Sequence, residues 1–339
     1  MPSVASRRRH LFRSRLVTTG LFLALGTLFC FALSLGDLRL TWAQTLQSLV
    51  GHGDSSTTFV VQSLRLPRTL CAVLVGAALG ISGSIFQSVT RNVLATPDII
   101  GVNSGASSAV AVAILTFGVT GPAIAVIAVV GALGAGALMY GLAWRDGVSG
   151  YRLVLIGIGV AAFATSITSY VLTTKPALEA QRALFWLTGS LNQSRWEDVR
   201  IGLVAVLLVL VSAPLLRRWM RALELGDETG TTLGLAVERA RVMALILAVV
   251  LAGLSVAIAG PVAFVALVAG PLAYRLTGRP GYLHWPAAAL GALIVLAADV
   301  TGAHLLGSLQ VPVGVLTAAV GAPYLLWTLA RSRSTGRRG

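Results

Sequence analysis

The dominant feature of this sequence is a series of long apolar runs separated by short polar segments. Charged residues make up only 11% of the 339 positions, and the mean hydropathy is +0.83. A soluble domain carries roughly 25% charged residues, so this composition cannot build a water-facing surface. The bilayer is the solvent that fits, since a spanning helix needs about 20 mostly apolar residues. The apolar runs lie at about 16–36, 69–89, 99–117, 120–142, 153–173, 199–216, 242–260, 262–276, 285–300 and 312–330.

We therefore predict an all-α, polytopic membrane protein with about ten transmembrane helices. The eighth run is short, follows Gly260-Pro261 and contains Gly270-Pro271, which predicts a broken or half-length helix. Irregular backbone at membrane depth requires protein or a water-filled cavity around it. No polar segment is long enough for a separate soluble core. The expected organisation is a single ten-helix domain, 16–330, between basic tails at 1–15 and 331–339.

The basic residues predict the orientation. If the N-terminus is cytoplasmic, the inside segments hold 19 of the 26 lysine and arginine residues and the outside segments hold 7. Such a bias marks the cytoplasmic side, and an even number of helices then places both termini in the cytoplasm. The net charge of +14 thus belongs to short loops and does not indicate nucleic-acid binding. The alternative, that the first run is a cleaved signal peptide, conflicts with its length of about 20 residues.

Small residues recur every four positions within two of the runs. Gly76-xxx-Gly80-xxx-Ser84 and Gly157-xxx-Ala161-xxx-Thr165 each place small side chains on one helical face. Helices in lipid associate through close backbone approach at such faces. We expect these faces to pack against other helices of the same chain, with the lining of a transport path as the alternative.

The chemistry-bearing motifs that would identify an enzyme are missing from the sequence. There is no G-x-x-x-x-G-K-[ST] phosphate loop, and neither H-E-x-x-H nor G-x-S-x-G occurs. The two cysteines and four histidines lack metal-ligand spacing. We predict a protein that is not an enzyme, with no metal site and no directly bound cofactor.

The acidic residues bear on the energy source. Ion-coupled transporters carry ionisable groups inside their spans, whereas here nearly all acids fall in loops. Asp299 lies near a span, at its outer end, where we expect it to be solvated. Without an ATP site or a buried ion relay, the chain must take its energy from a partner. An ion-coupled secondary transporter remains the alternative from another class.

Several stretches, in order from about residue 60 to 330, resemble the FecCD-type permease family of importers for ferric siderophores, haem and vitamin B12. The first is Arg65-Leu66-Pro67-Arg68, followed by V-G-A-A-L-G-I-S-G-S-I-F-Q (75–87) and R-N-V-L-A-T-P-D-I-I-G-V-N-S-G-A (91–106). The second is L-G-D-E-T-G-T-T-L-G (225–234). The third is A-G-P-V-A-F-V-A-L-V (259–268), with V-P-V-G (311–314) and G-A-P-Y-L-L-W (321–327). These last stretches are most similar to the iron-siderophore branch.

The resemblance implies a ten-helix permease subunit in a bacterial cytoplasmic membrane that imports an iron(III)-siderophore by alternating access. Its expected partners are a second permease, identical or paralogous, two ATP-binding-cassette ATPases that use the ATP, and an extracytoplasmic substrate-binding protein. No nucleic-acid partner is expected. Haem or vitamin B12 import is the alternative within the family.

The resemblance also assigns roles to residues. Arg65 and Arg68 would dock the binding protein, with headgroup anchoring as the alternative. The loop at about 217–241 would couple to the ATPase, where Asp227 and Glu228 also favour a helix N-terminus. The ATPase-coupling residues expected in this loop are Leu225, Gly226, Asp227, Glu228, Leu233, Gly234 and Leu235.

Polar residues near the pathway allow two readings each. Asn92 and Asp98 are suited to capping the third span, and by analogy their loop lies near the cytoplasmic gate. In the fifth span, Thr165, Ser166 and Ser169 could line the pathway, or they could bond to carbonyls of their own helix.

The chain departs from the family pattern in two places. It reads V-A-G-P-L-A-Y-R at 268–275, where the family has V-A-P-(H or Q)-L-A-R-R. A family arginine before the last span is replaced in the neighbourhood of Ala303 and His304.

Overall fold

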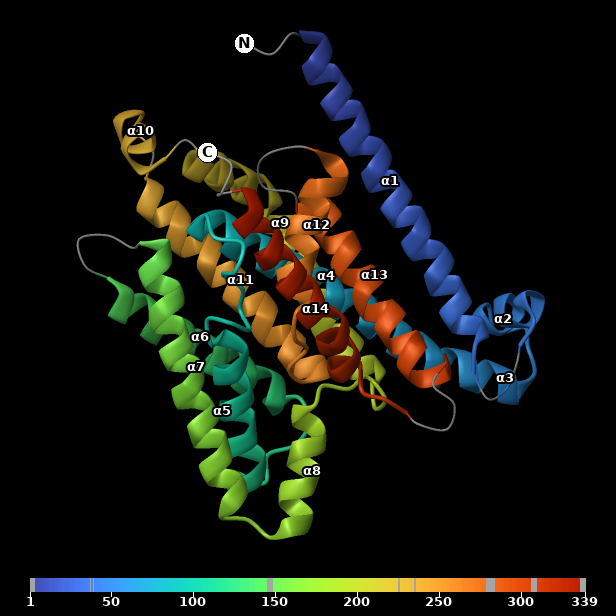
Figure 1. Cartoon of the computed structure of the whole chain (residues 1–339). Coiled ribbons are helices and arrows are strands. Elements are labelled where there is room, and N and C mark those ends of the chain that lie inside the picture. Colours follow the sequence, from blue (N-terminus) through green and yellow to red (C-terminus); the bar gives the residue numbers. More distant parts are fainter. Residues whose placement is uncertain are drawn as a thin grey trace.

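The computed structural model describes residues 4–36, 38, 40–144, 149–224, 226–234, 236–278, 284–305 and 310–335. In this part of the chain the regular elements are all helices (Figure 1). The α-helices are α1 (Val4–Ser34), α2 (Trp42–Leu49), α3 (Ser55–Phe59), α4 (Leu66–Thr90), α5 (Val102–Phe117), α6 (Ala123–Ala143), α7 (Gly150–Thr173), α8 (Ala177–Leu187), α9 (Trp196–Glu224), α10 (Asp227–Thr232), α11 (Val237–Ala259), α12 (Val265–Thr277), α13 (His284–Val300) and α14 (Val313–Thr335). Two π-helical turns, η1 (Val60–Arg65) and η2 (Thr301–Leu305), precede α4 and follow α13.

Each of the ten apolar runs coincides with a helix, which confirms the predicted all-helical membrane fold. Seven segments are long and apolar enough to cross a membrane by length and composition: they fall on α1, the α3–α4 stretch, α6, α7, α9, α11 and the α13–η2 stretch. Shorter apolar helices occupy the remaining three runs, as α5, α12 and α14. The sequence patterns did not indicate α2, α3 and α8, which lie between the apolar runs.

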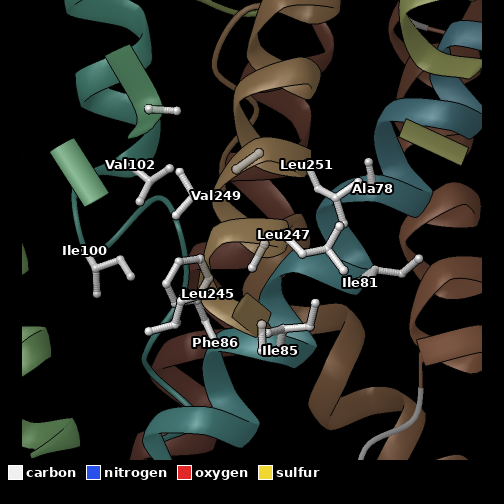
Figure 2. Packing of buried hydrophobic residues seen from close by; sticks show 14 of the residues in the cluster. Ala78, Ile81, Ile85, Phe86, Ile100, Val102, Leu245, Leu247, Val249 and Leu251 are labelled. Carbon is white, nitrogen blue, oxygen red and sulfur yellow. The ribbon is translucent and has the colours of Figure 1, made fainter. Parts of the chain in front are cut away.

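The helices form an inner group and an outer group. Between 67% and 78% of the residues in the apolar windows of α4, α11 and α13 are buried, against 11% to 28% for α1, α6, α7 and α9. Helix α4 packs against α13, α11, α12 and α9 and therefore lies at the centre. Figure 2 shows the core side chains of α4 and α11 pointing toward one another, with Ile81 beside Leu247. Val102 of α5 approaches Val249 on the opposite side of α11.

The small-residue face of α4 is used for packing within the chain, as predicted. A Cβ atom added to Gly76 would overlap the carbonyl oxygen of Gly291 on α13, and one added to Gly291 would overlap that of Gly76. The two helix backbones are therefore in direct contact. The second small-residue face packs in the same way, because Gly157 of α7 lies against Ile100 and Ala161 lies against Gly101.

The eighth run forms the half-length helix that its glycines and prolines predicted. Helix α11 ends at Ala259, Gly260 has a φ of 69°, and Phe264 adopts the left-handed conformation with a φ of 66°. Helix α12 has 13 residues and so spans about 20 Å, short of a hydrocarbon core of about 30 Å. Its first residues, Val265, Ala266 and Leu267, are buried, so its N-terminus lies within the helix bundle, where backbone N–H groups need partners.

The contact between α4 and α13 gives a stability prediction. We expect Gly291→Ala to destabilise the protein by about 1–3 kcal/mol, because the added methyl group overlaps a backbone oxygen and the two helices must separate. The matched control is Gly134→Ala, since a Cβ at this exposed position of α6 meets nothing within 4 Å. The midpoint of thermal unfolding of the full chain in detergent measures the stability of both variants. Equal midpoints for the two variants would show that the contact does not limit stability.

Candidate functional site

Arg68 and Asp299 form a two-point ion pair at the end of the bundle that the arginine bias predicts to face outward, here called the outer end. Nε of Arg68 donates to Oδ2 of Asp299 at 2.9 Å, and Nη2 donates to Oδ1 at 2.8 Å. Arg68 begins α4 and Asp299 ends α13, so the pair joins these two central helices. The Asp299 side chain is only 9% exposed. The prediction of a solvated Asp299 is therefore wrong, because the guanidinium of Arg68 supplies the charge and donors that a buried carboxylate requires.

Arg65 lies one turn before Arg68 and is also held by the chain itself. Its Nη1 donates to the carbonyl of Leu33 at 3.0 Å, and its Nη2 donates to the carbonyl of Leu38 at 2.6 Å. These contacts fasten the end of α1 to the start of α4. Both arginines thus lie together at the outer end, each with acceptors from this chain. Their docking of a binding protein stays a prediction.

The 91–98 segment follows α4 at the opposite end of this helix from Arg68, and it contacts α9 and α12. Arg91, in the left-handed conformation with a φ of 51°, ends α4 and donates from Nη2 to the carbonyl of Leu223 on α9 at 2.8 Å. Asn92 accepts from the backbone N–H of Leu94 at 2.9 Å and closes a local turn. Asp98 accepts from the backbone N–H of Phe264 at 3.0 Å. The segment therefore links the end of α4 to α9 and to α12.

The prediction that Asn92 and Asp98 cap the third span is wrong. That span begins as α5 after Gly101, and no side chain caps its N-terminus. The preceding residues form backbone turns, in one of which the N–H of Ile100 donates to the carbonyl of Thr96 at 3.0 Å. Asp98 instead supplies an acceptor at the start of α12, whose N-terminus lies inside the bundle. The N–H groups at the start of a helix have no acceptor within the helix, and the Asp98 carboxylate satisfies the one of Phe264. Nothing in the structure bears on a gating role for these residues.

Two of the three polar residues singled out in α7, Thr165 and Ser166, bond to their own helix, as one interpretation predicted. Thr165 donates to the carbonyl of Ala161 and Ser166 to that of Ala162, both at 2.8 Å. Thr165, Ser166 and Ser169 are all exposed on the surface of the single chain. Their hydroxyl oxygens remain available as acceptors, so lining of a pathway stays a prediction.

The expected coupling loop contains a short helix. Helix α10 begins at Asp227, as the acidic residues at this position predicted, and it lies between Gly226 and Gly234, with φ angles of 93° and 74°. Leu233 follows α10 and is 63% exposed. Leu225, Leu235 and the side chain of Glu228 lie outside the described residues. Contact with an ATPase stays a prediction for this loop.

A charged network lies beneath α10. Arg241 of α11 donates from Nη2 to Oδ2 of Asp227 at 2.6 Å and from Nη1 to Glu238. Glu238 also accepts from the hydroxyl of Tyr140 on α6. The Arg241 side chain is 8% exposed, whereas that of Asp227 is 58% exposed. The network thus runs from an exposed carboxylate on α10, through a buried guanidinium, to α11 and α6.

A cavity of about 420 Å³ adjoins this network. It is lined by the end of α4, the start of α7, the end of α9, the base of α10 and the start of α11. The lining includes Thr90, Arg91, Gly150, Leu223, Asp227 and Arg241. Among the described residues, no group of three or more His, Cys, Asp or Glu residues is placed to hold a metal ion.

Sequence reasoning did not single out Arg241, Glu238 and Tyr140. A signal was present for Arg241, because an arginine directly before an apolar run calls for a partner when its helix is buried. The partners come from α10 and α6, and the pairing across helices is a property of the packed fold.

Comparison with known proteins identifies the relatives. The profile of the FecCD transport family matches residues 23–331. The chain is 43% identical over 291 residues to the ferric enterobactin transport system permease protein FepG of Escherichia coli (strain K12), covering 86% of this chain and 88% of that one. It is 37% identical to the achromobactin transport system permease protein CbrC of Dickeya dadantii (strain 3937), covering 97% and 95%. An inward-facing structure of a metal-chelate type ABC transporter superposes with a TM-score of 0.81 at 28% identity, covering 94% of this chain and 99% of the other.

The outer ion pair gives a prediction for Asp299. Replacing it with Asn leaves the Arg68 guanidinium partly buried without its charge partner, which should lower stability by about 1–3 kcal/mol. The matched control is Asp54→Asn, because Asp54 is an exposed carboxylate at the start of α3 with no side-chain capping bond. Thermal unfolding in detergent compares the two. An Asp299→Asn midpoint equal to that of Asp54→Asn would show that the pair contributes nothing to stability.

Proposed function

This chain belongs to the FecCD transport family, and we propose on that premise that it is the membrane-spanning permease of an ATP-binding-cassette importer for iron(III)-siderophore complexes. The observation that carries the proposal is similarity over nearly the whole length to permeases of ferric enterobactin and achromobactin transport systems. The family match and the apolar helices place the chain in a bacterial cytoplasmic membrane as a multi-pass protein. Iron homeostasis is the cellular process that such an importer serves.

The working importer would pair this chain with a second permease, identical or paralogous, with two ATPase subunits and with an extracytoplasmic binding protein. We propose ten membrane crossings with both termini in the cytoplasm, so that α10 faces the ATPase and Arg65 and Arg68 lie on the opposite side. The two permeases would surround the substrate path and open it alternately to each side. The segment containing Asn92 and Asp98 and the polar face of α7 with Thr165, Ser166 and Ser169 would border this path.

ATP hydrolysis would reside in the partner subunit, because the sequence of this chain has no phosphate loop. The ion-coupled alternative requires an ionisable group in the spans that changes its charge during transport. Asp299 does not fit that role well, since Arg68 holds both of its oxygens in an ion pair. Haem and vitamin B12 are the alternative substrates within the family, and the names of the relatives favour siderophores.

The test is uptake of radiolabelled ferric siderophores by cells that express the full chain with its partner subunits. We expect wild-type uptake to stop when ATP is depleted and to persist when the proton gradient alone is dissipated. Asp227→Lys/Glu228→Lys should abolish uptake, because it reverses the charge at the start of α10. Uptake that survives ATP depletion and follows the proton gradient would instead identify a secondary transporter. Uptake of radiolabelled haem or vitamin B12, but of no ferric siderophore, would identify the alternative substrate.

Arg65→Glu/Arg68→Glu tests the docking surface. We expect uptake at low binding-protein concentration to fall about tenfold or more, because charge attraction governs the encounter rate. The matched control is Asp299→Asn, which breaks the Arg68 pair without adding negative charge to the outer end. If the control loses as much uptake as the reversal at equal surface expression, the arginines act through the fold and not through docking.

A further inference from the structure

Helix α10 stands away from the body of the protein (gold, upper left in Figure 1). The cavity of about 420 Å³ lies at its base, between α10 and the ends of α4, α7 and α9. The side chains of α10 that line this cavity have no packing partner on that side, because dispersion attraction falls off steeply across a gap between atoms. Close packing therefore cannot be what fixes α10 along this side.

The covalent connections of α10 are also weak constraints. Gly226 precedes the helix and Gly234 follows it, both in backbone conformations that favour glycine. Neither residue has a side chain that could pack and lock the connection. A force applied to α10 would be absorbed partly by rotation at these two positions unless a further contact holds the helix.

The bond between Asp227 and Arg241 supplies such a contact. Arg241 lies in the second turn of α11, with its guanidinium buried and shared between Asp227 and Glu238. A buried guanidinium is held firmly because each lost acceptor leaves a donor unpaired in a poorly solvated site. Its planar fork also fixes the direction of each bond, which a lysine ammonium does not do. Glu238 in turn receives the hydroxyl of Tyr140, which carries the connection to α6.

We infer that Arg241 is a positioning residue that transmits displacement of α10 to α11 and α6 during transport. This inference rests on the proposed function, in which the ATPase acts on α10. Helix α11 packs directly against the central helix α4, and α6 packs against α5 and α7. A movement of Asp227 that pulls on Arg241 thus reaches both the inner group and the outer group of helices. The Asp227–Arg241 ion pair is thus a firm contact between α10 and α11, whereas the chain on either side of α10 passes through a flexible glycine.

The first arm of the test uses the purified full chain alone. Hydrogen–deuterium exchange of 227–232 reports how firmly α10 is held, independently of any transport activity. We expect Arg241→Gln and Asp227→Asn to accelerate exchange in α10 at least severalfold. Arg239→Gln is the matched control, because Arg239 is exposed, lies two residues earlier on α11 and has the same charge. Unchanged exchange in Arg241→Gln would overturn the inference whatever the chain transports.

The second arm uses the complete importer in proteoliposomes, with ATP hydrolysis and ferric-siderophore uptake measured in the same vesicles. We expect Arg241→Gln to lower uptake per ATP hydrolysed about tenfold, within the usual range of coupling between sites, while the ATPase still co-purifies. The uptake per ATP hydrolysed of Arg241→Lys should fall between those of the wild type and Arg241→Gln, because lysine keeps the positive charge but lacks the planar guanidinium. Since both residues act through one contact, Asp227→Asn/Arg241→Gln should be no worse than Arg241→Gln alone.

Two outcomes separate this inference from the proposed function. If the wild type imports with ATP and Arg241→Gln keeps the wild-type ratio, or loses the ATPase altogether, Arg241 does not transmit movement and the inference is wrong. If the wild type shows no ATP-dependent uptake, the proposed function fails and the transmission role fails with it. Faster exchange in α10 would then assign Arg241 to local structure only.

Discussion

Direct backbone contact between α4 and α13 is the interaction on which the rest of the structure depends. Helices in lipid gain little from burying apolar side chains, because the surrounding acyl chains are equally apolar. Close approach at Gly76 and Gly291 brings many atoms into van der Waals range instead. It also brings the start of α4 near the end of α13, so that Arg68 and Asp299 meet. The buried ion pair is thus a consequence of the glycine contact, and it in turn fixes the register of the two helices.

The sequence predicts the fold well and the site in part, and the difference has a physical cause. Run length and the Gly260-Pro261 break are local properties, and they correctly indicate the helices and the interruption before α12. The orientation that the arginine bias indicates stays a prediction. Back-bonding of Thr165 is local as well, since donor and acceptor lie on one helix. The partners of Asp98 and Asp299 are 166 and 231 residues away along the chain. Such pairings depend on which helices are neighbours, and no spacing in the sequence encodes that.

The two charged networks lie at opposite ends of the bundle and differ in what they join. Arg68 and Asp299 join two long helices that already pack against each other, so the pair reinforces a contact that exists without it. Arg241 joins α11 to α10, which has a cavity at its base and glycine at both ends. An arginine–carboxylate pair therefore reinforces an existing helix contact at Asp299, whereas at Asp227 it is the main contact that holds α10 to α11. This contrast is the reason to assign transmission to Arg241 and a static role to Asp299.

Helix α12 shows how the interrupted backbone is accommodated between these ends. At its buried N-terminus, the N–H of Val265 bonds to the carbonyl of Ala263 in the preceding turn, and Asp98, from the loop that follows α4, accepts the N–H of Phe264. Arg91 in the same loop bonds to the end of α9, next to α10. One short loop therefore contacts both the broken helix and the end of the helix that leads into α10. A displacement at α10 that shifted α9 would also act on the start of α12, through side chains already bonded at both points.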